Sequence, residues 1–116
     1  MELYNPTTSD IAVDGLFIDD LAAGGSSPKP IPAGTIVPAG GWWVMDFTSF
    51  LNNTGTEEVR FLAIVGGVET VYDSTGYTLS STAYDQVFHR IGDGGSWCTS
   101  ISTNVTKGSA NPTTCP

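Results

Sequence analysis

Hydrophobic and polar residues alternate in short runs along this chain, and no run keeps apolar residues at helical spacing with caps at both ends. Successive side chains of a strand point to opposite faces, so such runs predict strands. We expect strands at residues 2–5, 13–19, 34–37, 41–47, 57–65, 68–74, 85–91 and 96–101. The stretch at 82–91 comes closest to a helix, but its β-branched and aromatic residues suit a strand equally well.

Glycine and proline mark the turns between these runs. Gly66 and Gly67 form the whole connection between two β-rich runs, which predicts a tight hairpin because the primed turns need positive φ. The sequence Pro-Ala-Gly occurs at 32–34 and again at 38–40, and each copy predicts a bend with proline at the first corner. The Gly-, Ser- and Pro-rich residues 20–34 are expected to form a surface loop.

Roughly seven to nine short strands at intervals of about ten residues are typical of a β-sandwich with Greek-key connections. A closed barrel is the competing architecture. Composition agrees with an all-β fold, since charged residues make up only 14% and the chain carries 14 glycines and 7 prolines. The length of 116 residues fits one domain over 1–116. Because the chain opens abruptly in strand-like sequence, we expect it to be excised from a larger protein.

Adjacent tryptophans are the most conspicuous apolar feature. Trp42 and Trp43 follow the second Pro-Ala-Gly and must point to opposite faces of a strand, so one is expected in the core and the other outward. Met45 shares the face of Trp43, which makes this face a candidate contact surface. A loop folded over that face is the alternative. One of the tryptophans, together with Tyr77 and Tyr84, could also form a platform for sugar rings.

Charge narrows the range of partners. Twelve carboxylates against four Lys and Arg give a net charge of −8. Such a surface repels phosphate backbones, so nucleic-acid binding is not expected. No apolar run approaches the roughly 20 residues of a membrane span, and we expect no membrane insertion.

Two cysteines lie near the end of the chain. Cys98 and Cys115 are 17 residues apart, and the spacer between them is polar and rich in Ser, Thr, Asn and Gly. A disulfide closing this loop would be worth roughly 3 kcal/mol in the chain-entropy model. We expect this bond, and therefore an oxidising compartment, while two unpaired thiols are the alternative.

Reactive side chains form no recognisable catalytic motif. His89 is the only histidine, and Ser96 lacks the residues of a nucleophile elbow, so a triad of these two with Asp93 is not expected to act. We therefore expect no catalytic residue and no cofactor. Asp19, Asp20 and Asp93 could contribute oxygen ligands to Ca²⁺. They are weak candidates, because the spacing of a calcium-binding loop is absent, and solvated carboxylates are the simpler interpretation.

Several segments together resemble the lamin tail domain family of its bacterial type. They are "ELYNPT", "DIAVDGLFIDD", "IPAGTIVPAGGWWVM", "HRIGDGGSW" and "TKGSANP", in the family's order and over almost the whole chain. The resemblance implies an immunoglobulin-like β-sandwich. It also implies structural roles, in turns and core, for Glu2, Asn5, Gly15, Pro32, Gly34, Pro38, Gly40 and Trp97.

Two departures from the family pattern carry consequences. Leu16 stands where the family usually has tryptophan, so the core there should be smaller or be filled by Phe17 or Trp97. The family also has a strand before the one that begins at Glu2, and here only Met1 precedes it. The missing first strand would leave an open sheet edge, which is either empty or covered by a second copy in a homodimer.

These observations favour a non-catalytic interaction or adhesion module of a secreted or cell-surface protein. Its partner would be a protein or a glycan. A carbohydrate-binding module with exposed tryptophan and tyrosine is the main alternative. A small hydrolase is the third reading, and the absence of a convergent cluster of titratable residues argues against it.

Overall fold

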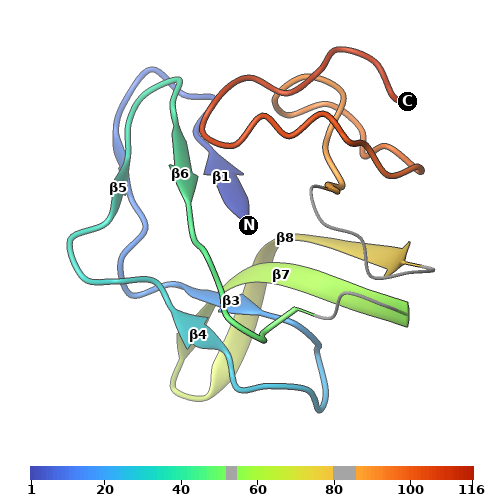
Figure 1. The fold of residues 1–116 in the computed structure, drawn as a ribbon. Helices are drawn as coiled ribbons and strands as arrows, with labels where there is room; N and C mark the ends of the chain where they lie inside the picture. Colours follow the sequence, from blue (N-terminus) through green and yellow to red (C-terminus); the bar gives the residue numbers. More distant parts are fainter. Residues whose placement is uncertain (52–54, 80–85) are drawn as a thin grey trace. The chain divides into compact units, whose positions relative to one another are not determined.

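The computed structural model describes residues 1–51, 55–79 and 86–116, and within them every regular element is a strand (Figure 1). The strands are β1 (Glu2–Tyr4), β2 (Ile11–Ala12), β3 (Phe17–Asp19), β4 (Lys29–Pro30), β5 (Ile36–Val37), β6 (Trp42–Val44), β7 (Gly55–Val65) and β8 (Val68–Leu79). The all-β prediction is confirmed. No helix long and apolar enough to cross a membrane occurs in the described part of the chain.

The chain forms two compact units, each assembled from segments far apart in sequence. Unit 1 consists of Met1–Ile11, Ile36–Asp46 and the described part of Ala83–Pro116. Unit 2 consists of Ala12–Thr35 and the described part of Phe47–Thr82. The sheets are a β1–β6 pair, a β2–β5 pair and a four-stranded sheet.

Unit 2 is built on the four-stranded sheet, with strand order β4-β3-β7-β8 and antiparallel neighbours. The short strand β3 lies in its interior, where Ile18 is paired with Phe61 and Phe17 with Leu62. Cross-strand partners share a face, so Ile18 and Leu62 lie on opposite faces. Both are fully buried. Each face of the sheet is therefore covered where β3 crosses β7.

The predicted Gly-Gly hairpin is confirmed. Gly66 and Gly67 have φ of 58° and 79°, and Val65 is paired with Val68 across the turn. Two consecutive positive φ values are what a type I′ turn requires, and glycine meets them without strain. β8 extends beyond the predicted 68–74, and a bulge between Phe61 and Leu62 shifts its register.

Unit 1 contains the antiparallel pair β1–β6, in which Tyr4 lies opposite Trp42 and Leu3 opposite Trp43. The second Pro-Ala-Gly leads into β6 as a turn closed by the Gly41 amide, which donates to the Pro38 carbonyl at 2.9 Å. Gly40, at the third position, has a φ of 64°.

The first Pro-Ala-Gly forms the same turn in unit 2, closed by the Thr35 amide and the Pro32 carbonyl at 3.3 Å, with Gly34 at a φ of 80°. Both bends are therefore as expected, but the position predicted for proline is wrong. In each turn proline is the first residue, and it contributes its carbonyl as the acceptor. Alanine occupies the first corner, and the positive φ that defines the turn falls on glycine.

Two predicted boundaries need correction. The strand predicted at 13–19 is limited to β3 because a turn intervenes, with Gly15 at a φ of 79° and the Leu16 amide donating to the Val13 carbonyl. The surface loop predicted at 20–34 contains β4, whose Pro30 pairs with Phe17. β4 lies at the edge of the sheet, which is where proline is tolerated because its missing N–H breaks no ladder.

The last two predicted strands, 85–91 and 96–101, are not continuous strands in the described residues. They form isolated bridges, Val87 with Ser102 and Arg90 with Trp97. The Cys98 amide donates to the His89 carbonyl at 3.0 Å. One residue separates Val87 from His89, whereas three residues separate Cys98 from Ser102. The two extra residues on the second segment interrupt the ladder.

Candidate functional site

The distal end of the β7–β8 hairpin exposes apolar side chains. Val65 and Val68, paired beside the turn, are 76% and 68% exposed. Tyr72 is 58% exposed, and its ring lies 5.6 Å from that of the half-buried Phe61. We call these four residues the hairpin face. They comprise one exposed pair beside the turn and one aromatic contact further along the hairpin. Exposed apolar side chains that cluster are a feature of contact sites.

The length of β3 explains why this face is exposed. β3 pairs with β7 only from Arg60 to Leu62, so Ala63–Val65 continue beyond Phe17, the first residue of β3 and the partner of Leu62. The part of the hairpin beyond Leu62 consequently has two strands, whereas the sheet has four strands where Phe61 and Leu62 pair with β3. Beyond Leu62 its residues have no strand partner other than β8 among the described residues.

β8 is also the outer strand of this sheet among the described strands. An outer strand presents backbone N–H and C=O groups that a further strand can pair with. The hairpin thus combines an apolar face with a sheet edge. Together these are the two elements of recognition by strand addition, in which main-chain hydrogen bonds supply affinity and side chains supply specificity.

An ion-pair network joins the middle of β7 to β3 and to the turn end of β8. Arg60 on β7 forms an ion pair with Asp19 of β3 at 2.6 Å and with Glu69 of β8 at 2.7 Å. The side chains of Arg60 and Asp19 are only 6% and 3% exposed, and that of Glu69 is 34% exposed. The hydrogen bond to Glu69, followed by that to Asp19, raises the pKa of Arg60 above its usual value. One guanidinium therefore connects three adjacent strands.

Tyr77 lies opposite Glu57 on the same sheet and is half-buried. Burial, followed by the charges of Glu57 and Asp20, raises the pKa of Tyr77 to about 12. The phenol therefore stays neutral at physiological pH. Asp20 is itself buried and accepts the Ser26 amide with both carboxylate oxygens, at 3.1 and 2.9 Å. Gly25 makes this loop possible, since a Cβ there would lie 2.6 Å from the Asp20 carboxylate.

The weak Ca²⁺ candidates all have protein partners. Asp19 is paired with Arg60, and Asp20 accepts the Ser26 amide. Asp93, which belongs to unit 1, accepts the Trp42 indole N–H and the Asn111 amide, both at 3.1 Å. Within residues 1–51, 55–79 and 86–116, no group of three or more His, Cys, Asp or Glu is placed to hold a metal ion.

The predicted aromatic contact residues are distributed over both units. Trp42, Trp43 and Met45 of unit 1 are all half-buried. The Trp42 ring lies 5.6 Å from that of Tyr4, and its indole nitrogen is held by Asp93. Tyr77 belongs to unit 2, and Tyr84 lies outside the described residues.

Most of the predicted structural residues lie at turns. Asn5 is buried, and its side-chain amide donates to the carbonyls of Ser9 and Val37 at 2.8 and 3.0 Å. Its Oδ1 accepts both the amide and the hydroxyl of Thr7. The two donor and two acceptor positions of the Asn5 side chain are thus all hydrogen-bonded, which explains how this polar residue can be buried. Glu2, another predicted structural residue, accepts the Gly108 amide.

Sequence reasoning missed two aspartates that brace the Pro-Ala-Gly turns. Asp14 accepts the Gly34 amide at 3.1 Å, and Asp10 accepts the Ala39 amide at 3.0 Å. In each case a carboxylate from a distant segment binds an N–H of the turn. The sequence carried no signal for these contacts, since Asp14 lies 20 residues before Gly34 and Asp10 lies 29 residues before Ala39.

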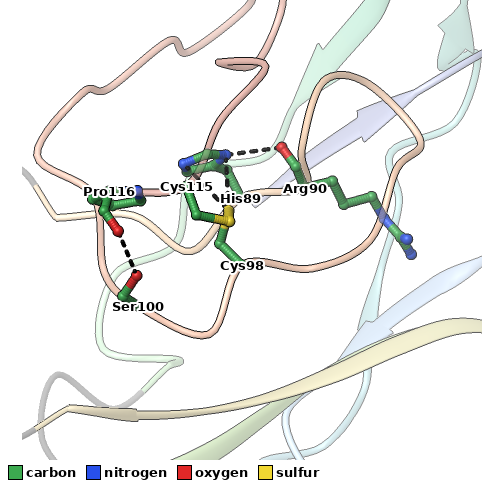
Figure 2. The surroundings of a disulfide bond; sticks show 6 residues. All are labelled: His89, Arg90, Cys98, Ser100, Cys115 and Pro116. Carbon is green, nitrogen blue, oxygen red and sulfur yellow. Dashed lines mark hydrogen bonds between the residues drawn. A yellow bond between two sulfur atoms is a disulfide. The ribbon is translucent and has the colours of Figure 1, made fainter.

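The predicted disulfide between Cys98 and Cys115 is present, with a Cα–Cα distance of 5.6 Å (Figure 2). His89 lies against it, 4% exposed, with both ring nitrogens 3.9 Å from the Cys98 sulfur. Nδ1 is 2.8 Å from the Arg90 carbonyl. Among the described residues His89 has no hydrogen bond to Asp93 or to Ser96.

Trp97 is half-buried and carries the Arg90 guanidinium over its ring, 4.5 Å from the centroid.

Comparisons of the chain with protein-family models, with curated proteins and with solved structures found no match. The class of this protein is therefore described from its own fold and from the hairpin face. It is an all-β, disulfide-bonded chain with an apolar strand edge.

Proposed function

We propose that this chain is a non-catalytic interaction module of a secreted or cell-surface protein, and that it contacts protein partners through the β7–β8 hairpin. The observation that carries the proposal is the exposure of Val65, Val68 and Tyr72 on one rigidly anchored hairpin. An anchored hairpin loses little conformational entropy on binding, so more of the contact energy appears as affinity. The buried Arg60 network supplies this anchoring.

Two features support the location and the fold of the proposal. The Cys98–Cys115 disulfide favours an oxidising compartment outside the cytosol. The antiparallel sheets and the two Pro-Ala-Gly turns agree with an immunoglobulin-like β-sandwich of the lamin tail type. We assign the chain to that fold by this resemblance, and its outer-strand contact would be a form of adhesion.

A carbohydrate-binding module is the second candidate, and it rests on unit 1. The rings of Trp42 and Tyr4 lie together, tilted by 30°, and both are half-buried. Aromatic faces of this kind can stack on sugar rings. The test is a titration with purified polysaccharides followed by tryptophan fluorescence. No change of emission with any glycan would remove this candidate.

The test of the protein-interaction proposal uses a panel of purified extracellular proteins, screened by biolayer interferometry against the immobilised chain. The variant is V65T/V68T, which keeps β-branched side chains and removes one methyl group at each position. Losing about 0.8 kcal/mol per buried methyl group predicts a decrease in affinity of roughly tenfold or more.

The matched control is Val105→Thr, because Val105 is 45% exposed but belongs to unit 1. We expect this variant to bind as the unmodified chain does. Circular dichroism of each variant checks that the fold is kept. Binding that is equally strong in V65T/V68T, or a panel in which no protein binds, would contradict the proposal.

A further inference from the structure

We propose that the Cys98–Cys115 disulfide is a thiol-exchange site with a fixed polarity: an incoming thiolate attacks Cys115, and Cys98 leaves as a thiolate stabilised by His89. The occupant of the site is a small thiol or a cysteine of another protein. Three observations carry the inference, namely the unequal exposure of the two cysteines, the contact of His89 with one sulfur, and the anchoring of the surrounding chain.

The two halves of the disulfide differ in access. Cys98 is 4% exposed, whereas Cys115 is exposed. Thiol–disulfide exchange needs a collinear approach of the attacking thiolate to one sulfur, so access decides which sulfur is attacked. The approach to Cys98 is blocked by the protein, and the approach to Cys115 is open.

The leaving group is the sulfur that His89 touches. Nδ1 of His89 faces the Arg90 carbonyl, which can only accept, so Nδ1 carries a proton. Nε2 is then the ring nitrogen outside that hydrogen bond, and it lies 3.9 Å from the Cys98 sulfur. A thiolate beside an imidazolium is stabilised, and a more stable thiolate leaves faster.

The Arg90 side chain nearby serves a different contact. The Arg90 guanidinium donates to the Gly95 carbonyl at 2.8 Å and lies over the Trp97 ring. Figure 2 shows this side chain pointing away from the disulfide, while the His89 ring faces it. The imidazole is therefore the group that acts on the departing sulfur.

The exchange step is balanced. A lone pair of the incoming thiolate forms a new S–S bond with Cys115 Sγ, the Cys98–Cys115 bond breaks, and its electron pair stays on Cys98. The incoming thiol is oxidised to a mixed disulfide as Cys98 is reduced. A second thiolate that attacks the incoming sulfur releases Cys115 and completes the reduction.

The rest of unit 1 stays in place after this step. The Gly92 amide donates to the Pro112 carbonyl at 2.7 Å, and Asn111 remains bonded to Asp93. The last few residues lose their covalent link through Cys115 and keep the exposed hydrogen bond from the Ser100 hydroxyl to the Pro116 carbonyl. The exchange therefore presents a mobile, accessible thiol or mixed disulfide without unfolding the domain.

The first experiment maps the site of attack in the full chain. The oxidised protein is incubated briefly with excess glutathione, and a larger excess of N-ethylmaleimide is then added, which blocks the Cys98 thiol and the remaining glutathione and prevents reversal. Peptide mass spectrometry then locates glutathione. We expect at least tenfold more glutathione on Cys115 than on Cys98. Equal labelling, or a preference for Cys98, would overturn the inference.

The second experiment tests His89 with H89Q, and with Ser100→Ala as a control beside the same loop, where the Ser100 hydroxyl contacts the Pro116 carbonyl. We expect exchange about tenfold slower in H89Q and unchanged in S100A. In the fully reduced proteins, thiolate absorbance near 240 nm should appear at a lower pH in the unmodified chain than in H89Q. Equal rates and equal absorbance would refute the role of His89, and the mapping in the unmodified chain stands as a test even if H89Q does not fold.

Discussion

Two ion pairs of nearly equal length should differ greatly in their contribution to stability, because one is buried and the other is exposed. Asp19 is 2.6 Å from Arg60, with side-chain exposures of 3% and 6%. Asp46 is 2.8 Å from Lys107, with exposures of 76% and 56%. The perturbation is Asp19→Asn, with Asp46→Asn as its control, since both remove one negative charge at constant shape.

The magnitude follows from what remains after each change. In D19N the Arg60 guanidinium stays buried and keeps one charged partner, Glu69, which is itself 34% exposed, together with its long hydrogen bond to the Leu21 carbonyl. Leaving a buried charge underpaired costs about 3 kcal/mol. A loss of this size lowers the unfolding temperature by roughly 10 °C or more in a domain of this length. In D46N both former partners are already solvated, and we expect no measurable change.

The assay is thermal and urea unfolding followed by far-ultraviolet circular dichroism. Fluorescence alone is unsuitable because all three tryptophans belong to unit 1, whereas the Asp19–Arg60 pair belongs to unit 2. The reasoning is refuted if D19N and D46N unfold at the same temperature. It is also refuted if E69Q costs more than D19N, because the partly exposed Glu69 should contribute less.

Three further predictions concern other parts of the chain. Tyr77 should ionise near its pKa of about 12 when absorbance at 295 nm is titrated against pH. Because this pKa lies above the usual 10, the contribution of Tyr77 to the stability of the folded chain is complete below pH 10 and is lost as the pH rises towards 12. A midpoint at pH 10 would contradict the described burial. Replacing both Cys98 and Cys115 by serine should remove roughly 3 kcal/mol of stability, measured by urea unfolding against the oxidised chain, and an unchanged midpoint would count against the crosslink as a stabilising element. The outer edge of β1, which has β6 as its one strand partner among the described residues, should pair with a second copy, so that sedimentation equilibrium gives twice the chain mass; a single-chain mass at every concentration would exclude this homodimer.

Local turn chemistry made part of the fold predictable. Gly66 and Gly67 specify a hairpin within four residues, because their positive φ values need no information from the rest of the chain. The ends of the strands depend instead on distant partners. β4 is a strand only because β3 lies beside it, and its Lys29-Pro30 sequence gives no strand signal of its own. Pairing energy gained at a distance overrode local preference in this case.

The candidate site was less predictable for the same reason. Alternation placed Val65 and Val68 in strands, but it could not show which face of the hairpin would be covered. Coverage is decided by β3, whose Asp19 lies 41 residues before Arg60 and whose first residue, Phe17, pairs no further along β7 than Leu62. The Arg60 network likewise joins residues that have no relation in sequence. Only the disulfide followed from composition, because the chain contains no other cysteine.

The anchored base and the exposed tip of the hairpin depend on each other. A two-stranded hairpin alone is marginally stable in water, so the distal part of β7 and β8 needs a fixed base to keep its geometry. Arg60 provides this by joining β3, β7 and β8 through one buried guanidinium. The apolar tip is then held in an extended form that a partner strand can pair with, without first having to order it. If the tip served only as a loop between strands, two valines exposed beside the turn would lower solubility and contribute nothing to the core, and polar residues would serve better there.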